Sequence, residues 1–385
     1  MIYLDHNATT PPLPEALISL ARVANEAWGN ASSLHTSGRT AKVEIENARE
    51  ELAALIHAAP QEIIFTGGGT EACNFAILGA ARAQKNKGRH LVASALEHSA
   101  VKAVLRALVE DGWEITWVDP DGDGVIAPES VVAALRPDTV LCAVMHANNE
   151  VGTVQPIAAI GSLLKAKSIT FFCDMTQSLG KIPVDVKALN VDLAAFAAHK
   201  IGGVKGAGAL YVRKGVTVES LVRGGGQERG LRGGTENTPG IAALGAAAAW
   251  WRAHGDAERA RAGVLRDALQ SALLQRIPNL QVTAQNVDHP VERLPNTLHV
   301  TFPGARGDVL VMALDLRGMA VSAGSACASG SVKPSEVLLA MGRSTEEASS
   351  SLRFSLGFGN TPADIPVVAD AVAAVYAASR AAYGS

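Results

Sequence analysis

The chain has 385 residues, 48% of them hydrophobic, and a formal net charge of −3, which predicts two or three domain-sized units with a sizeable core. No basic run is present, so we expect no dedicated nucleic-acid surface. The first residues lack the basic and apolar regions of a signal peptide and no apolar run has the length of a membrane span, so we expect a cytoplasmic protein without membrane contact.

From about residue 62 the sequence alternates short apolar segments with helical ones. The predicted strands lie at residues 63–65, 90–93, 113–118, 139–145 and 169–174, with two more ending near 197 and 212. The predicted helices begin at Thr70 and His98, and after Pro128 and Pro156. This alternation is typical of βαβ units, so we predict an α/β fold with a mainly parallel sheet flanked by helices.

An Ala-rich helical stretch at residues 238–274 leads into a second unit. Its predicted strands lie at 297–302, near 320 and at 352–356, and its helices lie at 308–316, at 334–341 and at the end of the chain. The pattern indicates a smaller α+β domain.

Polar residues follow the predicted strands of the larger unit. They are Thr70 after a run of glycines, His98, Asn149, Asp174 and Lys200. Ligands of open α/β sheets bind beyond the carboxyl ends of the strands. We therefore expect these side chains to share one binding site.

Lys200 and Asp174 are the residue types that pyridoxal phosphate (PLP) requires, a lysine for its aldehyde and an aspartate for its ring nitrogen. Residues 67–70 (GGGT) join a strand to a helix, where free amides bind phosphate and glycine permits close approach. The nucleotide P-loop pattern is absent. Each feature alone also has a plain explanation, as a solvated lysine, a strand-end cap or a glycine turn.

The four cysteines show no paired spacing and no cluster with histidine, so neither a disulfide framework nor a metal site is predicted. Cys73, Cys142 and Cys173 lie in apolar or loop-to-helix settings that suit inert thiols. Cys327 has only small neighbours, which fits an accessible nucleophile or an incidental loop cysteine. Arg353, in the middle of a strand, needs an anionic partner, either a ligand carboxylate or a structural carboxylate.

Eight motifs in one order carry a family resemblance that runs from residues 3–11 to residues 351–357. They lie at residues 66–71, 97–98, 145–152, 174–178, 199–200, 224–230, 234–237 and 324–327. Together they resemble the NifS/IscS-like cysteine desulfurases of the class V aminotransferase family, which are fold-type I PLP enzymes. The resemblance implies a seven-stranded-type sheet in a large domain at residues 14–255. It also implies a small domain at 256–385, on which residues 1–13 pack.

The resemblance assigns roles residue by residue. Lys200, Cys327 and His98 are expected to be catalytic, and Asn30 and Arg353 to bind the substrate carboxylate. The expected cofactor-binding residues are Gly69, Thr70, His98, Asn149, Asp174, Gln177, His199, Lys200 and Thr235. Thr235 is expected to come from the other subunit of a homodimer.

The implied reaction removes sulfur from L-cysteine, giving L-alanine and a persulfide on Cys327. An acceptor protein then takes the sulfur for iron–sulfur cluster assembly or tRNA thiolation. No resident metal is expected, although Cys327 could ligate an iron–sulfur cluster transiently with a scaffold partner. The alternatives are a selenocysteine lyase, another class V PLP transferase, or a non-enzymatic subunit descended from such enzymes.

Two positions depart from the family. Ala197 stands where a serine hydroxyl commonly contacts the cofactor phosphate, so one hydrogen bond worth about 1 kcal/mol is expected to be missing. Ala31 stands where proline is frequent, and we expect no consequence from it.

Overall fold

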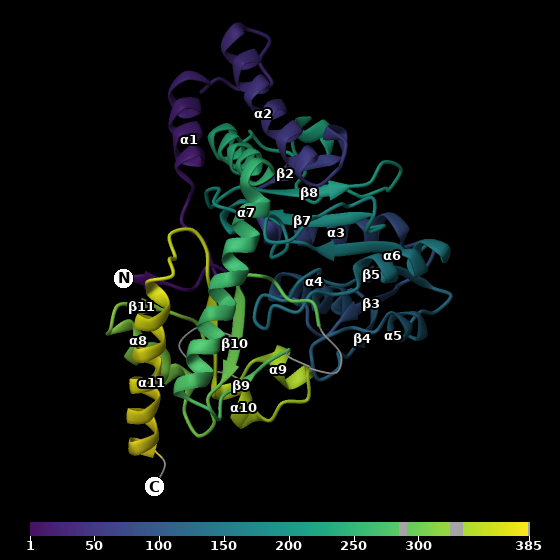
Figure 1. The fold of residues 1–385 in the computed structure, drawn as a ribbon. Helices are drawn as coiled ribbons and strands as arrows, with labels where there is room; N and C mark the ends of the chain where they lie inside the picture. Colours follow the sequence, from purple (N-terminus) through teal and green to yellow (C-terminus); the bar gives the residue numbers. More distant parts are fainter. Residues whose placement is uncertain (285–290, 324–333, 384–385) are drawn as a thin grey trace.

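A seven-stranded sheet forms the centre of the larger part of the molecule (Figure 1). The computed structural model describes residues 1–284, 291–323 and 334–383. The strands are β2 (Ile63–Thr66), β3 (His90–Ser94), β4 (Glu114–Val118), β5 (Thr139–Ala143), β6 (Thr170–Asp174), β7 (Leu193–Ala197) and β8 (Gly208–Val212). Their order is β2-β8-β7-β6-β5-β3-β4, and only β8 pairs antiparallel with its neighbours. The predicted mainly parallel α/β fold is confirmed.

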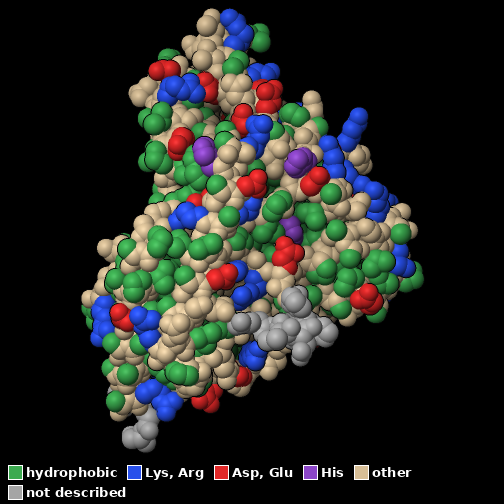
Figure 2. All heavy atoms as spheres, viewed as in Figure 1, with side chains coloured by type: hydrophobic (Ala, Val, Ile, Leu, Met, Phe, Trp, Pro, Cys, Tyr) green, Lys and Arg blue, Asp and Glu red, His purple; other side chains and the backbone are tan. Residues whose placement is uncertain are grey.

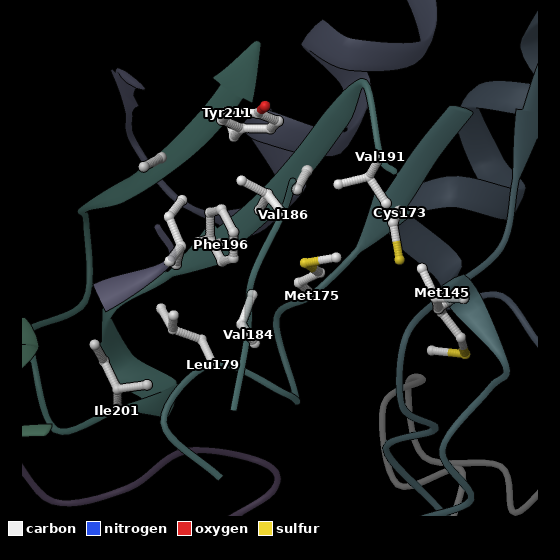
Figure 3. Close-up of a cluster of buried hydrophobic side chains, with 14 of the residues drawn as sticks. Met145, Cys173, Met175, Leu179, Val184, Val186, Val191, Phe196, Ile201 and Tyr211 are labelled. Carbon is white, nitrogen blue, oxygen red and sulfur yellow. The ribbon is translucent and has the colours of Figure 1, made fainter. Parts of the chain in front are cut away.

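Helices cover both faces of this sheet, which explains why its inner strands are buried, whereas the edge strand β4 is partly exposed. Neighbouring residues of β6 point to opposite sides, so Phe171 and Phe172 belong to different core clusters. Figure 3 shows part of the first cluster, including Cys173 and Phe196. The helices that pack on the face of the first cluster are α2 (Thr36–Leu55), α5 (Pro128–Ala133), α6 (Ile157–Ala166) and the start of α7 (Thr238–Arg276). The helices on the opposite face, which carries the second cluster, are α3 (Gly69–Gln84) and α4 (Ser99–Glu110).

A second core lies in the smaller part of the molecule. Its antiparallel sheet has the order β12-β10-β9, from β12 (Ser351–Ser355), β10 (Thr297–Thr301) and β9 (Gln281–Val282). The helices that pack on it are α8 (Gly307–Asp315) and α11 (Asp364–Tyr383), whereas buried residues of α9 (Glu336–Ala340) and α10 (Thr345–Ser349) belong to the core of the large sheet. The beginning of the chain joins this part, because β1 (Ile2–Tyr3) pairs with β11 (Met319–Ala320) and Asp5 forms a bridge with Ser355.

Helix α7 connects the two parts as one continuous element of 39 residues, roughly 58 Å long (Figure 1). The side chain of Asn237 caps its first turn by accepting from the Gly240 amide at 3.2 Å. Leu244 near its start belongs to the core of the large sheet, and Leu269 near its end belongs to the core of the small one. The domain boundary expected at residues 255 and 256 falls inside this helix.

Candidate active site

A cavity of about 370 Å³ opens at the carboxyl ends of the parallel strands. Loops that follow neighbouring strands supply one wall, and the N-terminal segment and the small sheet supply the other. The expected site residues that line it are Gly69, Thr70, His98, Asn149, Asp174, Gln177, His199, Lys200 and Arg353. The structure therefore brings together side chains that the sequence placed only at separate strand ends.

Asp174 lies buried at the end of β6, on one side of the cavity. Its Oδ1 accepts a hydrogen bond from the Thr176 amide at 2.9 Å. Burial, and then the charge of Asp174, raise the pKa of Cys73 well above its ordinary value. The Cys73 thiol beside this aspartate is therefore protonated near neutral pH.

Glu97 is a second buried acid beneath the same end of the cavity. Its Oε1 accepts from the Met145 amide at 2.6 Å. Burial, and then the nearby Asp174, raise the pKa of Glu97 to about 8. Near neutral pH this carboxyl is therefore mainly protonated.

His98 caps α4, which places its ring at the cavity wall. Nδ1 accepts from the Ala100 amide at 3.1 Å, so in the neutral ring the proton is on Nε2. Burial lowers the pKa of His98, and Lys200 lowers it further, against the opposing effect of Asp174. The result is a neutral, oriented imidazole.

Lys200 ends the short 3-10 turn η2 (Ala198–Lys200) that follows β7. Its Nζ donates to the carbonyl oxygens of Asn7 at 2.6 Å and Ala8 at 2.8 Å. Two residues later Gly202 has φ +83°, and a Cβ there would lie 2.6 Å from Leu13 Cγ. Glycine is therefore required for the turn to fit against the N-terminal segment.

The start of α3 forms the phosphate-type corner of the cavity. Gly68 caps the helix without a side chain, so amides of the first turn have no side-chain acceptor at that position. A Cβ on Gly69 would lie 3.2 Å from both the Ala197 Cβ and the Thr176 Oγ1. The Thr176 hydroxyl thus lies beside the position where the family's missing serine hydroxyl would be, which the sequence pattern did not reveal.

These residues fit PLP. The amide-rich corner at Gly69 suits a phosphate, the buried Asp174 suits a protonated ring nitrogen, and the Lys200 amine suits an aldehyde. All three line one cavity.

Asn7 is the residue that sequence reasoning missed most clearly. Its carbonyl accepts from Lys200 and, at 2.9 Å, from Gln177 Nε2. Its side-chain oxygen accepts from Lys181 Nζ at 2.8 Å and from Asn296 Nδ2 at 3.1 Å. Asn7 therefore links the lysine turn, the strand-end loop after β6 and the small domain.

Lys181 was also missed. It is buried, and its Nζ donates to Asn7 and, at 2.5 Å, to Gln177 Oε1. Burial, followed by the charges of Lys200 and Arg353, lowers its pKa well below the ordinary value. The only sequence signal for this pair was that Asn7 lies at residues 3–11, where the family resemblance begins, while Lys181 follows Gln177 by four residues.

Arg353 reaches the cavity from the middle of β12. Its Nη2 donates to Asp5 Oδ1 at 2.5 Å and its Nη1 to the Asn149 carbonyl at 2.9 Å. The partner that a buried arginine needs is thus an aspartate of the N-terminal segment, so a ligand carboxylate must bind beside Asp5 or displace it.

Two expected residues do not line this cavity. Asn30 is exposed in the loop between α1 (Pro14–Glu26) and α2, where its Oδ1 accepts from Ser32. Thr235 is exposed beside Gly67 and Arg232 at a separate hollow. Cys327 lies outside the described residues.

The described residues carry neither a membrane span of helical type nor a metal-binding cluster. No helix in them is long and apolar enough to cross a bilayer. They contain no group of three or more His, Cys, Asp or Glu side chains arranged to hold a metal ion. On the face shown in Figure 2, acidic and basic side chains are interspersed.

Comparisons with known proteins agree with this geometry. Residues 2–368 match the family described as "Aminotransferase class-V". The cysteine desulfurase IscS of Anaeromyxobacter dehalogenans is 46% identical over 367 residues, covering 94% of this chain and 89% of that protein. A solved NifS-like protein superposes with a TM-score of 0.90 at 33% identity, over 98% of this chain and 99% of its own. A solved structure of SspA in complex with cysteine gives 0.79 at 34% identity, over 93% and 99%.

Proposed function

The chain belongs to the class-V aminotransferase family and is a cysteine desulfurase, a PLP-dependent enzyme, and from this premise we propose how its cavity acts on L-cysteine. The observation that carries the proposal is that Lys200, Asp174 and Arg353 line one cavity. They supply an attachment point for an aldehyde, an anion for a ring nitrogen, and a cation for a carboxylate. L-cysteine, held there by its carboxylate, is the substrate.

PLP would be held by Lys200, by Asp174, by the Gly69–Thr70 corner and by His98, which all line the cavity. When bound, it supplies an electron sink that weakens bonds to the substrate α- and β-carbons. Asn149 and Gln177 lie at the cavity wall as hydrogen-bonding groups, although both ends of the Gln177 amide already bond to Asn7 and Lys181. His199 is anchored to Thr9 at 3.1 Å and supports the turn that carries Lys200.

Lys200 moves the substrate proton once its amine is free. The carbonyls of Asn7 and Ala8 bind and orient that amine inside the cavity, where it would accept the proton as a general base. Arg353 fixes the substrate carboxylate and so sets the direction in which the thiol of L-cysteine points.

Cys327 takes the sulfur. Its thiolate attacks the substrate sulfur, the bond between sulfur and Cβ breaks, and Cβ gains a proton, giving L-alanine and a Cys327 persulfide. The described thiols support this choice, because Cys73, Cys142 and Cys173 are buried and burial raises the pKa of each. None of these three supplies a thiolate near neutral pH.

We also propose the sulfur acceptor, the oligomeric state and the cellular location of this enzyme. The persulfide sulfur passes to an acceptor, either an iron–sulfur scaffold protein, with which Cys327 could share a cluster, or a tRNA-thiolation relay. The enzyme is a homodimer, which agrees with the exposed Thr235 and with Trp28 and Leu34, exposed by 74% and 90%. Unpaired thiols suit the reducing cytoplasm.

The test replaces each cysteine by serine in turn. After L-cysteine is added, persulfide is detected by alkylation and mass spectrometry, and alanine release is measured in parallel. Cys327→Ser should lose both signals, whereas the variants of Cys73, Cys142 and Cys173 should keep them.

If another variant loses both signals and Cys327→Ser keeps them, the nucleophile is misassigned. If all four release alanine without persulfide, the enzyme is a lyase.

A further inference from the structure

Ser322 and Arg353 are a directly opposed antiparallel pair. Ser322 donates its amide to the Arg353 carbonyl at 3.2 Å, and Arg353 donates its amide to the Ser322 carbonyl at 2.7 Å. Residues that exchange both bonds have Cα atoms about 5.5 Å apart, and their side chains project from the same face. The serine side chain and the base of the arginine side chain are therefore neighbours.

Both side chains are buried, with exposures of 3% and 4%, and both line the cavity. Among the described residues, Ser322 Oγ and Arg353 Nε have no hydrogen-bond partner. Buried polar atoms without a partner are rare in proteins. These two unsatisfied atoms come from adjacent residues, so they mark a place where a ligand with acceptor oxygens completes the structure.

The other contacts of Arg353 fix its orientation. Asp5 and the Asn149 carbonyl hold the two terminal nitrogens, which leaves Nε unpaired. His299, opposite Arg353 on β10, bonds through Nδ1 to Thr283 Oγ1 at 2.8 Å; its Nε2 also lacks a hydrogen-bond partner among the described residues, but His299 does not line the cavity. It therefore adds no group to the cavity wall.

We propose that Ser322 is a further substrate-positioning residue, whose hydroxyl joins Arg353 Nε in binding the α-carboxylate of an amino-acid substrate. The proposal rests on the function given above and extends it to one specific side chain. One carboxylate oxygen accepts from the hydroxyl and the other from the guanidinium edge, which fixes the plane of the carboxylate as well as its position. Asp5 keeps the guanidinium in place when the site is empty.

The experiment uses the PLP-loaded enzyme and two fragments of L-cysteine. The fragment 3-mercaptopropionate keeps the thiol and the carboxylate, and cysteamine keeps the thiol and the amine. Their dissociation constants are measured by calorimetry for wild type, Ser322→Ala and Ser322→Thr. Ser379→Ala is the matched control, because Ser379 is also a buried serine with an unpartnered hydroxyl but lies in α11.

We expect Ser322→Ala to weaken 3-mercaptopropionate about tenfold, as for one hydrogen bond to a charged group. Cysteamine binding should stay within about twofold, Ser322→Thr should restore most of the affinity, and Ser379→Ala should match wild type. For L-cysteine, KM should rise in Ser322→Ala while kcat changes little, since the contact is made equally in ground and transition states.

Equal binding of 3-mercaptopropionate by wild type and Ser322→Ala overturns the proposal. Equal weakening of both fragments also overturns it, because that would indicate a structural role. The function itself is judged separately, by whether wild type releases alanine from L-cysteine. Loss of that activity would leave the fragment measurements valid as a test of the carboxylate contact.

Discussion

The two ends of the cavity are built differently. The cofactor end takes Gly69, His98, Asp174 and Lys200 from the ends of strands of one sheet and from the turns that follow them. The substrate end takes Asp5 and Asn7 from the N-terminal segment, and Ser322 and Arg353 from the small domain. Strand register fixes the first end, whereas the second depends on how segments distant in sequence dock together.

The largest expected effect is at Lys200, where the two ends meet. Lys200→Ala should abolish alanine release from L-cysteine, because Lys181, the nearby buried lysine, is held by Asn7 and Gln177. Alanine is measured after L-cysteine is added to the purified variant. The exposed Lys205→Ala is the control and should retain activity within about twofold. Wild-type alanine production by Lys200→Ala would refute the assignment.

The second prediction concerns the buried acid of the cofactor end. The folded protein keeps the Glu97 proton up to about pH 8, while the unfolded chain releases it near the ordinary pKa of 4.5. Between these values the folded state binds more protons, so this carboxyl makes stability fall as pH rises, by at most about 1.4 kcal/mol per pH unit. Glu97→Gln should remove that contribution.

Urea unfolding at about pH 5 and about pH 8 measures the difference. The stability of Glu97→Gln should decline less over this range than that of wild type. The exposed Glu110→Gln, at the other end of α4, should follow wild type. If the two variants have the same pH dependence, Glu97 does not hold a proton in the folded protein.

The smallest effect is expected at the phosphate corner. Ala197→Ser should slow PLP loss, and Thr176→Val should speed it, because both positions lie beside Gly69. One hydrogen bond of about 1 kcal/mol corresponds to a roughly fivefold change in the affinity for PLP. Dialysis against a PLP trap, followed by absorbance, measures the loss.

The turnover of Ala197→Ser should stay near that of wild type, since the contact is remote from the reacting bond. If Thr176→Val retains PLP as wild type does, a different group occupies that contact.

Much of the cofactor end could be predicted from the sequence. Alternating strands and helices placed Asp174 and Lys200 at one sheet edge, and the family motifs added His98 and Gly69. The substrate end could be predicted only in part. Arg353 was identified because a charge in an apolar strand needs a partner, but no local pattern specifies that the partner is Asp5, 348 residues away.

Short elements and residues without a sequence pattern were not predicted, for similar reasons. The two-residue β9 and the five-residue α10 are too short to show a period. Lys181 resembled a surface lysine, since burial of a charged side chain depends on tertiary packing that a single sequence does not reveal. The clearest sequence signals came from glycine turns and strand ends, where local geometry limits the residue type.

The pairing of Asp5 with Arg353 also has a consequence for the newly made protein. A ribosome adds about 5 to 20 residues per second, so residue 353 emerges roughly 20 to 70 s after residue 5. During that interval the large sheet and its phosphate corner can form, while Asn7 and Asp5 still lack their partners in the small domain. A nascent chain of this enzyme could therefore bind its cofactor before it can bind an amino acid. Incompletely synthesised chains would then not consume cysteine.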